Sequence, residues 1–272
     1  MGGSGGLRTD VGGQERAARI HRFSPRARGK QARLTLAAVA VALALPSSAT
    51  ASVASARAFA QSRAGVVSFA YVDSSGRLHG YQPNLRYRSA SLVKAMILVA
   101  YLRRVSWGQL PLDRNARARL GPMITISDNI AANWAYERIG RGPTLDALAR
   151  RAGMSSFSAA SYWAYSMTSA RDQVLFFARL ERLTPPAHRA YALGLLRRIV
   201  PAQRWGIPRA APGWRLHFKG GWFESRHLWH QVAILQRGGS RLVLAVLTDR
   251  NPTDAYGRAT IEGVARRLLS SP

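Results

Sequence analysis

The residues best suited to chemistry in this chain are its few lysines. Of 40 lysine and arginine residues only three are lysine, namely Lys30, Lys94 and Lys219. A lysine amine can lose its proton when it is desolvated or lies near another cation, whereas a guanidinium effectively cannot. Two lysines retained by chance on the surface are the alternative interpretation. Lys94 and Lys219 are therefore candidates for work that arginine cannot do.

Ser91 precedes Lys94 by three residues at the start of a predicted helix, Ser91 to Arg104. That spacing puts a hydroxyl and an amine on one helical face, where the amine can take the hydroxyl proton. A serine that caps its own helix, followed by a solvated lysine, is the simpler alternative. The pair predicts an activated serine nucleophile.

Two further motifs contain residues of the same kinds. Ser127, Asp128 and Asn129 precede a predicted helix, Ile130 to Ile139, although all three are common helix caps. Lys219, Gly220 and Gly221 follow a predicted strand, Arg215 to Phe218, where glycines let a substrate approach the strand edge or form a bulge. The three motifs together are much more specific than any one of them.

Their order and setting resemble the S-x-x-K, S-D-N and K-x-G motifs of class A β-lactamases and penicillin-binding proteins. The resemblance runs from about Ala64 to the C-terminus and is closest at Ser127 to Asn133. The stretch Gln203 to Pro208, followed by Lys219 to Trp222, looks like a branch of exported β-lactamase-like serine hydrolases.

The resemblance implies a role for each residue. Ser91 would attack a carbonyl and Lys94 would accept its proton. Ser127, assisted by Lys219, would pass a proton to the leaving nitrogen, while Asp128 would be structural. The backbone N–H groups of Ser91 and Trp222 would form an oxyanion hole. The substrate-binding residues would be Asn129, Gly220, Gly221 and Trp222, with Asn129 holding the substrate amide and Lys219 also attracting a carboxylate.

The chain departs from the family pattern in three places. Gly220 stands where a serine or threonine usually binds the substrate carboxylate, so carboxylate recognition should be weaker. The stretch from 153 to 169, where class A enzymes carry a glutamate that positions the hydrolytic water, has no acidic residue. It offers Tyr162, Trp163 and Tyr165, which either line a cleft or cover the core. The missing glutamate predicts slow deacylation. The interval from Ser91 to Ser127 is also short, which predicts a trimmed helical part and a more open cleft.

The surrounding elements must bring these motifs together. Apolar alternation predicts strands at both ends of the chain, and helical spacing dominates the middle. An α+β fold follows, with an antiparallel sheet built from both chain ends, flanked by helices and carrying a helical insertion. The predicted strands are 65–73, 77–82, 215–218, 228–236 and 241–248; the other predicted helices are 114–120, 143–152, 169–183, 186–199 and 254–269.

The first 51 residues differ in composition from the rest. A basic segment is followed by the apolar run Leu34 to Leu45 and by small residues, as in a secretory signal peptide, although an uncleaved anchor is an alternative. We expect a signal peptide at 1–51, a linker at 52–63 and one hydrolase domain at 64–272. Its α/β part would be 64–90 and 200–272, and its helical part 91–199. The predicted location is extracytoplasmic.

Charge and composition limit the partners. The formal net charge is +27 and there is no cysteine, which excludes thiol catalysis. Because no nucleic-acid motif accompanies the charge, an anionic cell-wall polymer or a membrane surface is a better candidate partner than nucleic acid. No cofactor is expected, and His217, His227 and His230 lack metal-ligand spacing.

The sequence therefore predicts an exported serine hydrolase that acts through a Ser91 acyl-enzyme on β-lactams or related cell-envelope amides and esters. A D,D-peptidase-like or esterase activity with poor β-lactam turnover is one alternative. A non-catalytic wall-binding protein on the same fold is the other.

Overall fold

The computed structural model describes residues 1–2 and 48–270. The predicted signal peptide falls almost entirely outside this range and stays a prediction. No helix of the described residues has the length and apolar character that crossing a membrane requires.

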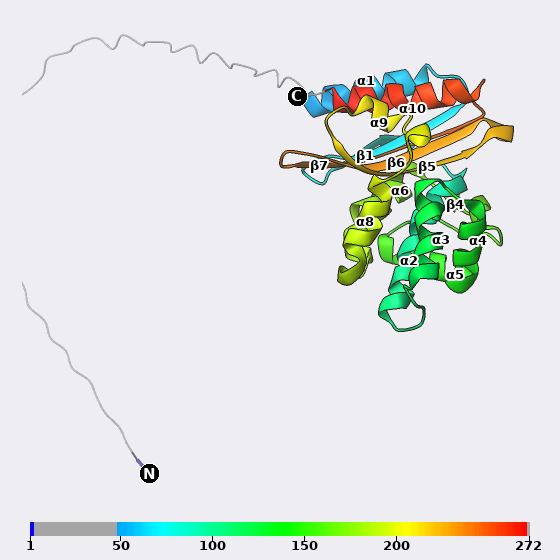
Figure 1. Ribbon diagram of the computed structural model, residues 1–272. Helices are drawn as coiled ribbons and strands as arrows, with labels where there is room; N and C mark the ends of the chain where they lie inside the picture. The colour runs from blue at the N-terminus through cyan, green and yellow to red at the C-terminus, as the bar shows by residue number, and fades with distance from the viewer. Residues whose placement is uncertain (3–47, 271–272) are drawn as a thin grey trace, which may run out of the picture. The chain divides into compact units, whose positions relative to one another are not determined.

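A five-stranded antiparallel sheet forms the centre of the fold (Figure 1). Its order is β2-β1-β7-β6-β5, so the chain's first strands pair with its last. Strand β5 lies at one edge of the sheet and pairs only with β6. The strands are β1 (Val66–Val72), β2 (Leu78–Tyr81), β5 (Arg215–Phe223), β6 (Leu228–Arg237) and β7 (Ser240–Asp249).

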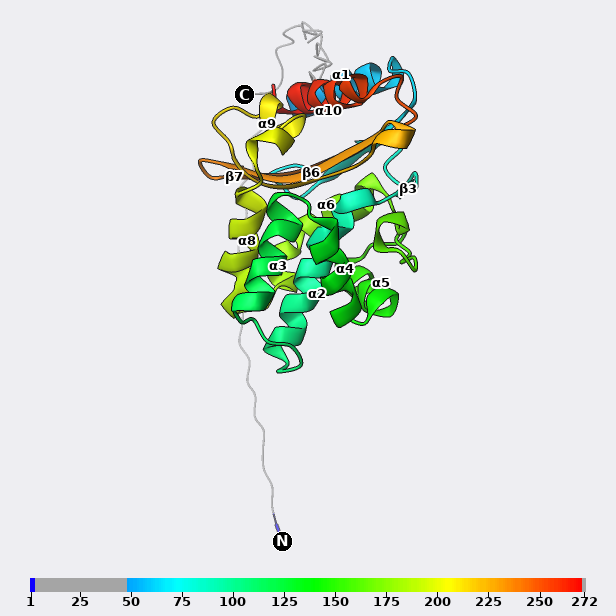
Figure 2. The same cartoon turned by 45° about the vertical axis from the view of Figure 1, so that its right-hand side comes forward.

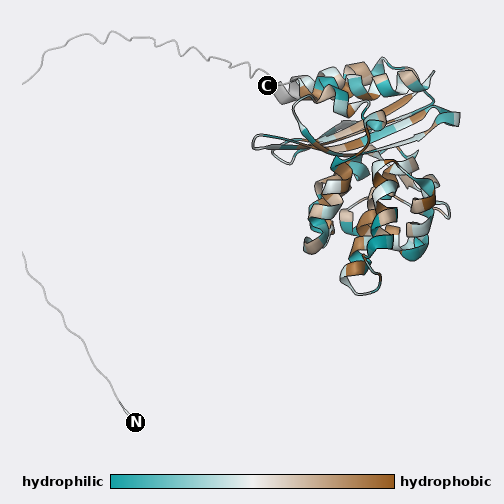
Figure 3. Cartoon of the chain, viewed as in Figure 1, coloured by the Kyte–Doolittle hydropathy of each residue, from teal (hydrophilic) through white to brown (hydrophobic). Residues whose placement is uncertain are grey.

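Two long helices cover one face of the sheet. Helix α1 (Ser48–Gln61) and helix α10 (Asp254–Leu269) lie side by side there, as Figures 1 and 2 both show. Both helices contain apolar and polar residues (Figure 3), and an amphipathic helix of this kind can bury its apolar side against the sheet. Phe69, Leu244 and Ile261 are fully buried between these layers.

The helical part packs against the opposite face (Figure 2). Its central helix α2 is buried from Lys94 to Leu102, so it serves as the rigid support for the residues at its start. The short strands β3 (Tyr87–Arg88) and β4 (Met167–Thr168) pair beside it. The helices on this face are α2 (Lys94–Ser106), α3 (Arg114–Thr125), α4 (Asn129–Arg138), α5 (Arg141–Ala152), α6 (Ala170–Ala178), α7 (Leu180–Leu183) and α8 (Arg189–Arg197).

The predicted α+β class and the sheet built from both chain ends are confirmed. The predicted linker at 52–63 is wrong, because most of it belongs to α1, whose Val53, Ala56 and Ala60 are buried. A cleavage near Ser52 would fall inside that helix. Helix α1 precedes β1 and packs on α10, so it belongs to the same folded unit as the sheet.

Three boundaries also differ from the predictions. Ser91 lies in a 3₁₀ turn (Ala90–Val93), and the α-helix begins only at Lys94. The helix predicted over 169–183 breaks at Arg179, whose guanidinium donates to the carbonyl of Ala152 at the end of α5. Lys219 lies in the middle of β5, because the strand continues past the glycines to Phe223.

Candidate active site

Ser91 and Lys94 are held at the junction of the 3₁₀ turn and α2. Side chains three residues apart eclipse one another in a 3₁₀ turn, so both project from the same side. Ala90, just before, has a positive φ of 46°, and the N–H of Ser89 donates to the carbonyl of Ser166 at 2.7 Å. The turn that presents Ser91 is therefore fixed by its neighbours, and Ser91 itself is half-buried.

The amine of Lys94 has no solvent exposure and three hydrogen-bond acceptors. Its Nζ donates to the carbonyl of Ser127 at 2.5 Å, to Oγ of Ser127 at 3.2 Å and to Oδ1 of Asn129 at 2.7 Å. The Ser91–Lys94 motif and the Ser127–Asn129 motif, predicted separately, thus meet at one amine.

Lys219 reaches the same hydroxyl from the sheet. Its Nζ, also without solvent exposure, donates to Oγ of Ser127 at 3.0 Å and to the carbonyl of Gly220 at 2.8 Å. The hydroxyl of Ser127 therefore accepts hydrogen bonds from two buried amines at once. Its own proton remains free to be donated elsewhere.

Burial changes the protonation of both amines. It lowers the pKa of Lys94 to about 7, while the carboxylate of Asp128 opposes that change by favouring the charged form. Burial also lowers the pKa of Lys219, and repulsion from Lys94 lowers it further. Near neutral pH, a large fraction of Lys94 is therefore unprotonated. In that form the amine has two N–H donors for its three acceptors and a lone pair that can accept a proton.

The loop that carries Ser127 is strained and tied from both sides. Ser127 has a positive φ of 63°, which is uncommon for a residue with a side chain. Asp128 caps α4 by accepting from the N–H of Ala131 at 2.8 Å, in agreement with the structural role expected for it. Gln203 donates to the carbonyl of Ile126 at 2.9 Å. Gln203 therefore helps to position the loop that carries Ser127. The sequence comparison singled out the stretch Gln203 to Pro208 but did not indicate this role.

Gly221 is where β5 comes closest to Ser91. A Cβ on Gly221 would lie 2.9 Å from the backbone nitrogen of Ser91 and 2.9 Å from that of Leu92. Neither backbone atom can move aside easily, so the position requires glycine for close approach. The next residue on β5 is Trp222, the other residue predicted to form the oxyanion hole.

Gly220 faces the other side of β5. A Cβ there would lie 3.2 Å from the ring of Trp205, which is itself buried. The ring of Trp222 stacks on Trp229 with 5.8 Å between centroids, and Trp205 meets both rings edge to face. The sequence did not reveal this tryptophan cluster, because the three residues come from separate segments.

The 153–169 segment places an aromatic ring against the Lys94 amine. The Nζ of Lys94 lies 4.7 Å from the centroid of Trp163, and Nε1 of Trp163 donates to Oδ1 of Asn133 at 2.7 Å. Trp163 is buried and covers the core, whereas Tyr162 and Tyr165 are exposed. Tyr165 also contacts Phe223 at the end of β5.

The histidines stand apart from this cluster of hydroxyls and amines. His230 is buried within β6, and burial lowers its pKa to about 4, so it is neutral. Its Nε2 donates to the carbonyl of Arg88, and this hydrogen bond links β3 to strand β6 of the sheet. Among the described residues, no group of three or more histidines and carboxylates is arranged to hold a metal ion.

Solved structures share this architecture. PBP-A is 20% identical over 80% of this chain and 94% of its own, with a TM-score of 0.72. A β-lactamase from Xanthomonas campestris is 18% identical over 82% of this chain and 98% of its own, with a TM-score of 0.74. An ancestral class A β-lactamase is 22% identical over 79% and 97%, with a TM-score of 0.70. At these identities the similarity establishes the fold.

No curated protein sequence matches this chain. The profile of the Beta-lactamase enzyme family, named Beta-lactamase2, matches residues 116–271, which is more than half of the chain and includes Ser127 and Lys219. With the fold and this match in hand, the chain belongs to the β-lactamase enzyme family.

Proposed function

We propose that this protein is an exported serine hydrolase that forms an acyl-enzyme at Ser91 with β-lactams or related cell-envelope amides and esters. The observation that carries the proposal is the meeting of two buried amines, Lys94 and Lys219, at the hydroxyl of Ser127. A structural role alone gives no reason to bury two lysines together, since like charges at short range are costly. An acyl-transfer site needs a base and a proton relay in this arrangement.

Acylation follows from the protonation states. Unprotonated Lys94 takes the proton of Ser91 Oγ as that oxygen bonds to the substrate carbonyl carbon. The negative charge formed on the carbonyl oxygen is stabilised by the backbone N–H groups of Ser91 and Trp222. Ser127 then donates its proton to the leaving nitrogen and recovers one from the neighbouring amines. The products of this step are the ester on Ser91 and a released or ring-opened amine.

Substrate recognition is divided between the two motifs. Asn129 is exposed and uses its carbonyl oxygen for Lys94, which leaves its NH₂ group to donate to a substrate carbonyl. Gly220 offers no hydroxyl, and the ring of Trp205 fills the space beside it. Binding of a substrate carboxylate should therefore depend on Lys219 alone and be weak.

A second activity is favoured by one contact. Because Trp163 packs over Lys94 where a water-positioning carboxylate would help, hydrolysis of the acyl-enzyme should be slow. A PBP-A variant with the same fold was solved as an acyl-enzyme complex with penicillin G. A D,D-peptidase-like or esterase enzyme that is acylated by penicillins and releases them slowly is thus the second candidate.

Intact-mass spectrometry of the full chain with a penicillin and with a chromogenic cephalosporin tests both activities. We expect a single adduct that persists for minutes or longer. Ser91→Ala should carry no adduct, while Ser62→Ala, in which an exposed serine is replaced, should label like the parent. Rapid turnover without an adduct would indicate a β-lactamase with another deacylation base. Absence of both adduct and turnover, with nitrophenyl esters also unreacted, would favour a non-catalytic wall-binding protein.

A further inference from the structure

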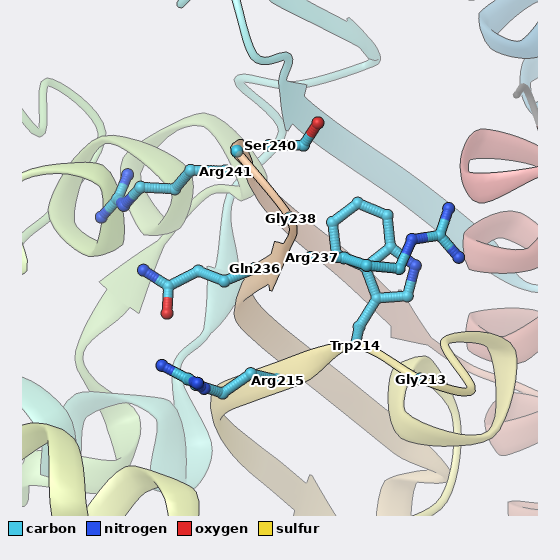
Figure 4. Close-up of a pocket in the computed structure, with 9 residues that line it drawn as sticks. Gly213, Trp214, Arg215, Gln236, Arg237, Gly238, Ser240 and Arg241 are labelled. Atoms are coloured by element: carbon cyan, nitrogen blue, oxygen red, sulfur yellow. The ribbon is translucent and has the colours of Figure 1, made fainter.

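The hairpin end of the sheet carries an unusual row of side chains. Arg215 on β5 is directly opposite Gln236 on β6, and Gln236 is directly opposite Arg241 on β7. Residues opposite each other in antiparallel strands project from the same face, so the three side chains form a cross-strand Arg–Gln–Arg row. Figure 4 shows them pointing to one side, while Trp214 and Arg237 point to the other.

The row borders a hollow of about 660 Å³. The hollow lies at the end of the hairpin, and its lining, all from described residues, contains no aspartate or glutamate. The lining residues are Gly213, Trp214, Arg215, Gln236, Arg237, Gly238, Gly239, Ser240 and Arg241. Adjacent strands lie about 4.8 Å apart, so the backbones of Arg215 and Arg241 are about 10 Å apart. The guanidinium groups of Arg215 and Arg241 thus come from positions on either side of the Gln236 amide.

The charge of this row is poorly balanced within the protein. Arg241 lies 3.5 Å from Glu181, and both side chains are partly exposed (35% and 45%). It also donates a long hydrogen bond of 3.5 Å to the carbonyl of Ala178. Arg215 is exposed and forms no ion pair with any described residue. Only Arg241 has a carboxylate beside it, so the row keeps an excess of positive charge, and a bound anion would balance that charge.

From this geometry we propose that the Arg215–Gln236–Arg241 row is a binding site for an anion with two linked phosphate groups. Each guanidinium has paired N–H donors that match phosphate oxygens, and Gln236 between them can donate to the bridging segment. The hollow is large enough for two such groups. Condensed phosphate and a phosphodiester polymer share this chemistry. The site does not depend on the proposed acyl-transfer function.

Isothermal titration of the full chain in 150 mM salt tests the site, with inorganic pyrophosphate, a glycerol-phosphate diester oligomer and orthophosphate as probes. We expect one of the two linked-phosphate probes to bind at least ten times more tightly than orthophosphate. Which of them binds identifies the source as condensed phosphate or diester polymer. Failure of both to bind more tightly than orthophosphate would overturn the proposal.

Paired variants separate this site from general surface charge. Arg215→Gln with Arg241→Gln should weaken binding at least tenfold and leave penicillin labelling of Ser91 unchanged. Arg114→Gln with Arg150→Gln removes the same charge from exposed positions on α3 and α5 and should weaken binding less than twofold. Equal weakening in the two pairs would show that only net charge attracts the anion. Thermal unfolding of each pair checks that the fold is retained.

Discussion

The indole of Trp163 lies over the amine of Lys94, with 4.7 Å between Nζ and the ring centroid. The ring is buried and held by its hydrogen bond to Asn133. It therefore contributes to the desolvation that lowers the lysine pKa. Trp163 belongs to the 153–169 segment, which has no carboxylate, so an aromatic ring and not an acid is the group of this segment that lies against the amine.

Replacement of this indole by a carboxylate should speed hydrolysis. Trp163→Glu should shorten the lifetime of the penicillin adduct about tenfold or more, because the carboxylate can act as a base for water. The change should also cost stability on the order of 3–5 kcal/mol, as loss of a buried tryptophan generally does. Decay of the adduct by mass spectrometry measures the first effect and thermal unfolding the second.

Trp163→Gln is the matched control, since it makes the same space without a base. Its adduct should last much longer than that of the glutamate variant. Equal lifetimes would mean that the indole merely excludes water and that no base is needed.

Lys94→Arg tests whether the amine acts as a base. An arginine keeps the positive charge but cannot give up its proton near neutral pH, so acylation should slow by at least about 100-fold. The rate of labelling by a fluorescent penicillin is the measurement. Circular dichroism must show an intact fold, because the site is fully buried. An arginine variant that labels at the parental rate would show that only charge matters at this position.

Acylation should depend on pH through the same amine. Burial lowers the pKa of Lys94 to about 7, and only the unprotonated form accepts a proton. The labelling rate should therefore be low at pH 5.5, rise through pH 7 and level off by about pH 8.5. Labelling that is flat over this range, or that falls as pH rises, would rule out unprotonated Lys94 as the base.

Much of this site could be predicted because its reactive residues lie in short motifs. Spacing alone puts Lys94 three residues after Ser91, whereas the strand pattern ended the strand at Phe218 and left Lys219, which lies inside β5, just beyond it. Contacts between segments that are distant in sequence could not be predicted, such as those of Trp163 with Lys94 and of Trp205 with Gly220. The helix α1 was missed because its alanine-rich sequence follows a leader-like segment, and it is held in place by packing on α10.

Gly221 offers a test of how closely β5 must approach the nucleophile. In Gly221→Ala the new methyl would lie 2.9 Å from the backbone nitrogens of Ser91 and Leu92, so the strand and the 3₁₀ turn must separate. The two N–H groups proposed to bind the oxyanion belong to these two segments, and their separation should slow acylation about 100-fold. Gly121→Ala on α3 is the control, since its methyl would meet nothing within 4 Å and alanine favours helix. Stopped-flow labelling of both variants at saturating penicillin gives the comparison. If Gly221→Ala is acylated as fast as Gly121→Ala, the oxyanion is not bound between β5 and the turn, and the roles proposed for the Ser91 and Trp222 N–H groups fail with it.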